Sequence, residues 1–144
     1  MKKEKFDKLN LDNQLCFPLY VAARQITSKY ASILKPFGLT YTQYIVFLAL
    51  WEKDKVTMGE LGNRLHLDNG TLTPLLKKME TLGYIERCRC KEDERVVKIV
   101  LTKKGISLKE DVKNIPDEIG SCVNLTKDEM ISLRKILDKI IVDK

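Results

Sequence analysis

Apolar side chains recur every three or four residues early in the chain, which is the spacing of one helix face. The pattern predicts a long helix over about residues 12–35, which Pro36 and Gly38 end. Pro18 is awkward there, because a proline beyond the first turn loses a backbone hydrogen bond and kinks the helix. The helix therefore begins near Pro18 or its first turn is bent. Thr40 is placed to cap a second apolar helix.

The next two predicted helices are short and joined by a tight turn. The first runs from about Thr57 to Leu65, and the second is capped by Asp68 and closed by Gly83. The second helix is rich in Thr, Asn and Lys. Two short helices in this order have the layout of a helix-turn-helix.

Two stretches rich in β-branched residues and cysteine follow, at 84–90 and 96–101, on either side of a charged run at 91–95. Strands that flank a short charged turn predict a β-hairpin. A hairpin directly after a helix-turn-helix is a wing.

The end of the chain predicts two more helices, at about 103–120 and 126–143. Thr126 and Glu129 form a capping box at the start of the second. The apolar stripes of these helices lie outside the helix-turn-helix and need a partner. A second copy of the chain would supply it.

The predicted fold class is therefore mainly α with a small β-hairpin, in the form of a winged helix-turn-helix. We expect a single winged-helix domain over residues 1–144, with a DNA-binding core at about 40–101. The helices at about 12–35 and 103–143 are expected to form the dimer. No internal repeat, linker or low-complexity segment divides the chain.

Composition narrows the class of protein further. The chain is 44% hydrophobic and 32% charged, as in a soluble folded domain. No apolar run reaches the roughly 18 residues of a membrane span, and the Lys-rich start lacks a signal-peptide core, so we expect a cytoplasmic protein without a membrane partner. A net charge of +6 favours a polyanion, either nucleic acid or an anionic membrane surface.

The residues expected to contact DNA lie at the start of the second short helix and at the hairpin tip. Short polar side chains in the first turns can reach bases or phosphates, lysines a turn later suit the DNA backbone, and a guanidinium at a hairpin tip can enter the minor groove. The candidates are Asp68, Asn69, Thr71, Thr73, Lys77, Lys78 and Arg95, with Asp68 better interpreted as the helix cap. Asp93 and Glu94 would brace Arg95 or pair with the core. Two alternatives need no DNA: the polar residues could simply start the helix, and the charged hairpin tip could be a solvated loop.

Four cysteines are the other candidates for chemistry. Cys16 lies near the start of the first helix, where free amides and the helix dipole stabilise a thiolate, although a buried packing cysteine would fit the same spacing. Cys88 and Cys90 share one face of a strand, which we expect to be the core face. Zinc would need further ligands, and His66 is the only histidine, so no metal site and no cofactor is expected.

The order of the elements over the whole chain resembles the MarR family of dimeric winged-helix transcription regulators. The residues that carry the resemblance are Leu61-Gly62, Leu67-Asp68, Gly70-Thr71-Leu72-Thr73-Pro74-Leu75-Leu76-Lys77 and Asp93-Glu94-Arg95. Within the family, Leu11-Asp12-Asn13-Gln14-Leu15-Cys16-Phe17 is similar to the organic hydroperoxide resistance regulator (OhrR) branch. The likeness is specific in the first helix, the recognition helix and the wing, and weak in the last two helices.

The resemblance implies a homodimeric repressor, not an enzyme, that binds a pseudo-palindromic site in double-stranded DNA and senses organic hydroperoxide through Cys16. It also implies tyrosines that contact this thiol across the dimer, at Tyr30 and Tyr41 and at a third position, Tyr20. Oxidation gives a sulfenic acid, and two-cysteine members then form a disulfide with the other subunit, here through Cys122.

Three alternatives stay open on the sequence. A thiol peroxidase would use the same cysteine, but the chain has no Cys-x-x-Cys motif, no cofactor-cradling glycine motif and no histidine near Cys16. In a MarR-type repressor induced by a phenolic ligand, the cysteines would have no part in induction. If Cys122 is idle, a small cellular thiol would cap the oxidised Cys16.

Overall fold

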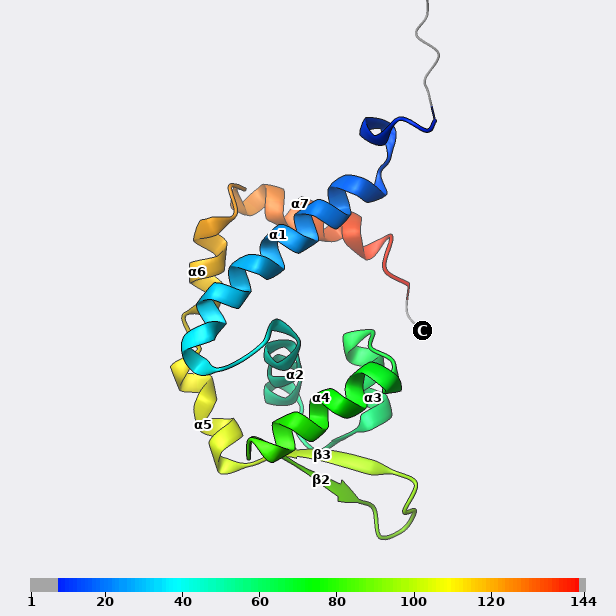
Figure 1. Cartoon of the computed structure of the whole chain (residues 1–144), viewed down its shortest axis with the longest axis vertical. Helices are drawn as coiled ribbons and strands as arrows, with labels where there is room; N and C mark the ends of the chain where they lie inside the picture. The colour runs from blue at the N-terminus through cyan, green and yellow to red at the C-terminus, as the bar shows by residue number, and fades with distance from the viewer. Residues whose placement is uncertain (1–7, 143–144) are drawn as a thin grey trace, which may run out of the picture.

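The computed structural model describes residues 8–142 and is mainly helical, with a small sheet at one end (Figure 1). The α-helices are α1 (Cys16–Leu34), α2 (Tyr41–Glu52), α3 (Met58–Leu65), α4 (Asn69–Thr81), α5 (Lys103–Asp111), α6 (Ile115–Cys122) and α7 (Lys127–Asp138). The strands are β1 (Val56–Thr57), β2 (Ile85–Arg89) and β3 (Val97–Leu101), and two 3-10 turns are η1 (Leu11–Asn13) and η2 (Lys35–Phe37). The predicted fold class is confirmed.

The predicted hairpin is present, and a third strand completes the sheet. β2 and β3 pair antiparallel, with Arg87 opposite Ile99 and Cys88 opposite Lys98. β1 pairs with the other edge of β3, so the strand order is β1-β3-β2 and Val56 also lies opposite Ile99. The sequence does not predict β1, because two residues are too few to show an alternating pattern.

The hydrophobic core lies between α2, α3, α4 and one face of the sheet, and the end of α1 together with α5 and α6 extends it. The inner face of α4 contributes Leu72, Leu76 and Met79, which are fully buried. Phe47 of α2 meets the ring of Tyr84 edge-on, with 5.2 Å between the ring centroids. This packing fixes α4 against the start of the hairpin and leaves the other face of α4 to solvent.

Side-chain caps start three helices where the sequence predicts them. Thr40, Thr57 and Thr126 each accept a hydrogen bond from the backbone N–H three residues later, and each belongs to a complete capping box. The helix starts at residues 41, 58 and 127 are therefore determined by residues within three positions of each start.

The start of α1 differs from the predicted helix beginning at residue 12. Residues 11–13 form the separate turn η1, and the chain is extended at Gln14. α1 then begins at Cys16, without a side-chain cap from Leu15. Pro18 is the third residue of the helix, where an N–H would have no partner within the helix. Of the two predicted alternatives, the helix that begins near Pro18 is confirmed.

The predicted helix at 103–120 is wrong, since the segment forms two helices, α5 and α6. Pro116 lies at the start of α6, and in a continuous helix its ring would clash with the carbonyl group of Val112. The predicted need for a partner is also wrong here, because Leu108, Ile115 and Ile119 are buried in the core of their own chain. The last helix ends at Asp138, before the predicted residue 143.

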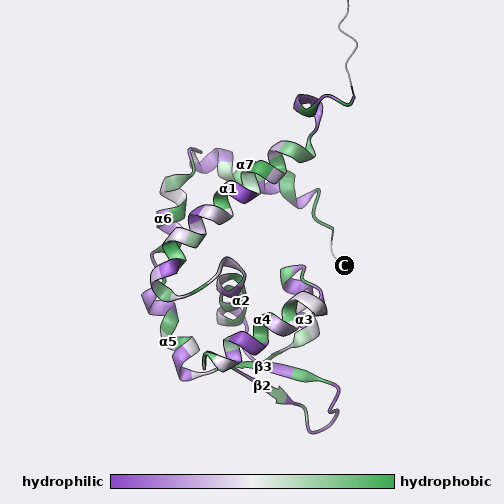
Figure 2. Cartoon of the chain, in the orientation of Figure 1, coloured by the Kyte–Doolittle hydropathy of each residue, from purple (hydrophilic) through white to green (hydrophobic). Residues whose placement is uncertain are grey.

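The outer arms are α1 and α7, which extend away from the winged-helix core except at the end of α1, where Leu34 is buried in the core (Figure 1). Apolar positions lie along both helices (Figure 2). Their exposed apolar residues include Leu15, Phe17 and Tyr20 near the start of α1, and Met130, Ile131, Leu133, Ile136, Ile140 and Ile141 in and after α7. Dimerisation through these arms stays a prediction. Among residues 8–142, no single helix is long and apolar enough to cross a membrane, and only the bent pair of α1 with η2 and α2 reaches that length and composition.

Candidate DNA interface and thiol site

The start of α4 presents the predicted DNA-contacting side chains as one surface. Asp68 is the helix cap, since its Oδ1 accepts from the backbone N–H of Thr71 at 2.8 Å. Asn69 and Thr71 are exposed in the first turn, and Thr73 is half-buried. Lys77 and Lys78 are exposed farther along the helix. The buried face of α4 points into the core, and of these side chains only Thr73 is partly covered by it.

Arg95 lies in the loop at the tip of the hairpin. The Oδ1 atom of Asp93 accepts from the backbone N–H of Arg95 at 2.9 Å, and the carbonyl oxygen of Asp93 accepts from Val96 at 3.0 Å. Within the described residues, the guanidinium of Arg95 makes no hydrogen bond or ion pair. Of the two predicted roles for the acids, Asp93 braces Arg95 through the backbone, and neither Asp93 nor Glu94 forms an ion pair with the core in the part of the chain described.

The wing and the start of α4 share a depression of about 400 Å³. Asn69 lines it from α4, and Arg95 lines it from the hairpin. Its remaining lining residues are Thr57, Met58, Gly59, Val96 and Val97. Two candidate DNA contacts that are 26 positions apart in sequence (95 − 69) therefore border one hollow.

Glu80 and Arg87 form a contact that the sequence does not predict. Oε2 of Glu80 accepts from Nη2 and Nε of Arg87 at 2.7 and 2.8 Å, and Oε1 accepts from the backbone N–H of Arg87 at 3.0 Å. These hydrogen bonds lower the pKa of the Glu80 carboxyl below its usual value. The pair joins the last turn of α4 to β2, and no periodic pattern could have revealed it.

Cys16 is the first residue of α1 and is exposed. Its own backbone N–H is among those that a helix start leaves without helical partners, and no side chain caps this end. Tyr20 lies one turn later and is also exposed. The guanidinium of Arg24 lies 5.3 Å from the centre of the Tyr20 ring and donates a 3.4 Å hydrogen bond to its hydroxyl. Cys16, Tyr20 and Arg24 thus follow one face of α1 at intervals of four residues.

Tyr30 and Tyr41 lie together but not beside Cys16 of the same chain. Their ring centroids are 4.7 Å apart, and the buried Tyr44 packs 5.7 Å from Tyr30. Burial, and then the neighbouring Tyr41, raise the pKa of Tyr30, so it carries its hydroxyl proton at neutral pH. Tyr30 is 14 residues after Cys16 on one helix, a rise of about 21 Å. Only a second subunit could bring these hydroxyls to Cys16.

Cys122 is the last residue of α6 and is exposed. It borders a hollow of about 270 Å³ together with Ala22, Ile26 and Lys29 of α1. Ala22 already lies about 9 Å farther along the helix axis than Cys16, on a different face. Both thiols are free. The structure does not bring Cys16 and Cys122 of one chain together.

The wing cysteines lie on the outer face of the sheet and not on the core face, contrary to expectation. Cys88 is exposed and Cys90 is half-buried. Because side chains alternate along a strand, Cys88 lies on the face opposite the buried Ile85. The residues described contain no group of three or more His, Cys, Asp or Glu side chains that could hold a metal ion.

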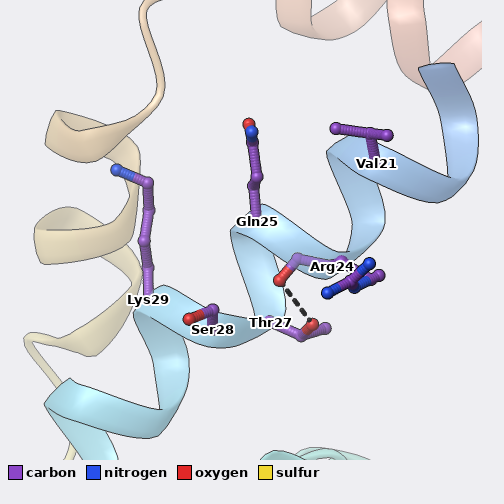
Figure 3. Close-up of a pocket in the computed structure, with 6 residues that line it drawn as sticks. All are labelled: Val21, Arg24, Gln25, Thr27, Ser28 and Lys29. Atoms are coloured by element: carbon purple, nitrogen blue, oxygen red, sulfur yellow. Dashed lines mark hydrogen bonds between the residues drawn. The ribbon is translucent and has the colours of Figure 1, made fainter.

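A surface hollow of about 760 Å³ lies along α1, and most of the side chains that line it are polar (Figure 3). Its lining residues are Val21, Arg24, Gln25, Thr27, Ser28 and Lys29. Figure 3 shows the hydroxyl of Thr27 bonded back to the carbonyl oxygen of Arg24, at 3.1 Å. Sites for small aromatic ligands are mostly apolar and enclosed. This hollow on one helix does not favour the phenolic-ligand alternative.

Comparison with known proteins places these surfaces in a family. The family model for the transcriptional regulator SarA/Rot matches residues 28–112. The organic hydroperoxide resistance transcriptional regulator of Bacillus subtilis is 44% identical over 93% of this chain and 89% of its own. The regulator SarZ of Staphylococcus haemolyticus is 44% identical over 91% and 89%.

Among solved structures, reduced AbfR bound to DNA matches with a TM-score of 0.77 at 39% identity, over 90% of this chain and 91% of that chain. AbfR is a protein of Staphylococcus epidermidis, and a disulfide-formed structure of it matches with a TM-score of 0.67 at 38% identity, over 92% and 93%. An overoxidized form bound to DNA matches with a TM-score of 0.73 at 39% identity, over 91% and 95%. These relatives are transcriptional regulators rather than enzymes. The chain belongs to the MarR family of winged-helix transcriptional regulators, in its SarA/Rot group.

Proposed function

We propose that this regulator is a homodimeric repressor that releases its DNA when an organic hydroperoxide oxidises Cys16. The observation that carries the proposal is the exposed thiol at the first residue of α1, in a chain that also carries a winged-helix DNA surface. The name of the Bacillus subtilis relative, at 44% identity over nearly the whole chain, supports organic hydroperoxide as the signal.

DNA binding uses α4 and the wing. The exposed first turn of α4 enters the major groove, where Asn69, Thr71 and Thr73 reach bases or phosphates. Lys77 and Lys78 neutralise phosphates, and Arg95 enters the minor groove beside them. Two copies place two α4 helices about one turn of DNA apart, so the operator is pseudo-palindromic.

The chemistry at Cys16 needs only the thiol and the peroxide. The Cys16 thiolate attacks one peroxide oxygen, the O–O bond breaks, and the products are a sulfenic acid and an alcohol. The thiol of Cys122 of the partner subunit then attacks the sulfenic sulfur, forming a disulfide and releasing water. In its own chain, Cys122 borders a hollow with a part of α1 that lies at least one and a half turns beyond Cys16, and this separation favours the intersubunit pairing.

Disulfide formation, rather than oxidation of the thiol alone, is the proposed trigger for release. In the AbfR relative, both the reduced and the overoxidized protein are bound to DNA, and a disulfide-formed state also exists. A crosslink between α1 of one subunit and the end of α6 of the other would displace the arms. The two α4 helices would then lose the operator spacing, and a lost half-site costs several kcal/mol, within the roughly 4–10 kcal/mol that separates specific from non-specific binding.

In this proposal the regulator acts on double-stranded DNA in the cytoplasm. It uses no cofactor in this mechanism. The apolar stripe of α7, exposed in the single chain, supports a second copy as its partner.

The test is binding of the operator by wild type and by Cys16→Ser, before and after treatment with cumene hydroperoxide. The proposal expects wild type to release DNA and the variant to stay bound. Release by both proteins would contradict it and favour a repressor with incidental cysteines. Peroxide consumption over many turnovers with a thiol reductant would favour a thiol peroxidase.

A further inference from the structure

A second pair of thiols lies on the wing, outside the thiol site. Cys88 is in β2, and Cys90 directly follows the strand. The backbone N–H of Cys90 donates to the carbonyl oxygen of Val96 at 2.9 Å, so the two sides of the hairpin stay hydrogen-bonded one residue beyond β2. The two cysteines are therefore two positions apart on extended chain and present their sulfur atoms on the same face.

This face is accessible and carries opposite charges. It is the outer face of the sheet, because Ile85 and Ile99 bury the other one. Lys98 lies directly opposite Cys88, which places their Cβ atoms about 5 Å apart. Glu86, two residues before Cys88, is the acidic neighbour on the same face. The Lys98 ammonium and the Glu86 carboxylate therefore both lie on the face that carries the Cys88 thiol.

The spacing disfavours a disulfide between the two sulfur atoms. Two residues of strand span about 6.7 Å, at the upper end of the Cα separations that disulfides tolerate. Their Cα–Cβ bonds also run side by side, whereas a disulfide needs Cβ atoms about 3.8 Å apart. One metal ion bound between two thiolates allows a wider separation, since metal–sulfur bonds of about 2.3 Å hold the sulfur atoms up to about 4.6 Å apart.

We propose that Cys88 and Cys90 form a two-thiolate site for a soft cation of the Cu(I) class. Soft thiolate ligands select Cu(I), whereas zinc takes four ligands, and the described residues offer no third His, Cys, Asp or Glu to such a group. Each thiol loses one proton as it binds, so two protons leave and one positive charge arrives. The outer face of the wing thereby changes from neutral thiols to a site with one net negative charge.

Occupancy of the site weakens DNA binding. The hairpin that carries the two cysteines also carries Arg95 at its tip, and a new negative charge on it repels the phosphates that the wing approaches. This step rests on the proposed function of the wing, whereas metal binding itself does not.

The experiment starts from the double variant Cys16→Ser/Cys122→Ser, which keeps only the wing thiols. Under anaerobic conditions, Cu(I) is titrated against the chromophoric chelator bicinchoninate. We expect one Cu(I) per chain and the release of two protons. Adding Cys88→Ser or Cys90→Ser should weaken Cu(I) binding at least tenfold. Binding that neither substitution changes, or no binding in competition with the chelator, would overturn the proposal.

The same proteins test the effect on DNA without any peroxide. Cu(I) should lower the operator affinity of the double variant several-fold and leave the variant that also carries Cys88→Ser unaffected. Equal affinity with and without bound Cu(I) would overturn the coupling to DNA. Because Cys16 is absent from these proteins, the outcome is independent of whether the peroxide mechanism is correct.

Discussion

The carboxylate of Glu80, in the last turn of α4, accepts hydrogen bonds from both the guanidinium and the backbone N–H of Arg87 in β2. This single side chain joins the recognition helix to the wing. Both partners are partly buried, at 35% and 28% side-chain exposure, so water screens the pair less than a surface ion pair. The pair therefore adds to the core packing in fixing α4 relative to the hairpin, the two elements that we propose contact DNA.

Glu80→Gln should loosen the wing. The amide keeps one acceptor but loses the charge-assisted hydrogen bonds, at a cost of about 1 kcal/mol in the free energy of unfolding. Urea unfolding measures this cost, and operator affinity should fall in parallel. The matched control is Glu110→Gln, which breaks the exposed Glu110–Lys113 pair and should change neither quantity. Equal effects of the two substitutions would remove the special role of Glu80.

Stability should also depend on pH through Glu80. Its pKa is lower in the folded protein than the ordinary value of 4.5, because of its hydrogen bonds to Arg87. The stabilisation is therefore complete above about pH 4.5 and is lost as the pH falls through the lower folded pKa. In acid titrations of the unfolding free energy, wild type should lose more stability over this range than Glu80→Gln. Equal losses of stability in wild type and in Glu80→Gln would contradict this role of the Glu80 carboxylate.

Gly105 should tolerate no side chain. A Cβ atom at this position would overlap the carbonyl oxygen of Tyr84, and the carbonyl of Gly105 accepts from the indole N–H of Trp51 at 3.0 Å. Gly105→Ala should therefore destabilise the protein by about 2 kcal/mol or more. Gly120→Ala, in α6, meets nothing within 4 Å and should stabilise it by up to about 1 kcal/mol. Thermal unfolding of the two variants distinguishes the positions.

The sequence predicts the local features of the fold and misses those that depend on side chains far apart in the chain. Caps such as Thr40 and Asp68 act over three residues, and each is observed where it is predicted. The break between α5 and α6 is also local, at Pro116, but the apolar stripe that predicts a single helix continues across it. The Glu80–Arg87 pair and the two-residue strand β1 have no periodic signal at all.

The sequence predicts which residues belong to the candidate sites but not how they are arranged in space. The exposure of Cys16 and the hollow shared by Asn69 and Arg95 follow from the fold. The prediction that Cys88 faces the core was wrong, because alternation alone does not say which strand face is buried. Contacts of Cys16 with Tyr30 and with Cys122 stay predictions, since they require a second subunit.

Arg95→Ala should weaken operator binding and reduce its salt dependence. Loss of one cationic contact lowers the slope of log K against log salt by about 1. The hairpin should keep its shape, because Asp93 holds the backbone of residue 95 and not its side chain. Fluorescence anisotropy at several salt concentrations measures the slope. Lys127→Ala, at the start of α7, is the control of equal charge and should bind as wild type does.

The most direct test measures DNA release and the oxidation state of Cys16 in the same sample. Wild-type dimer bound to a fluorescent operator is titrated with cumene hydroperoxide, and peptide mass spectrometry follows Cys16 and Cys122. We predict that DNA is released in step with a disulfide between Cys16 and Cys122 of the partner subunit, at about one equivalent of peroxide for each disulfide formed. Complete release while Cys16 is still a free thiol would contradict the central claim.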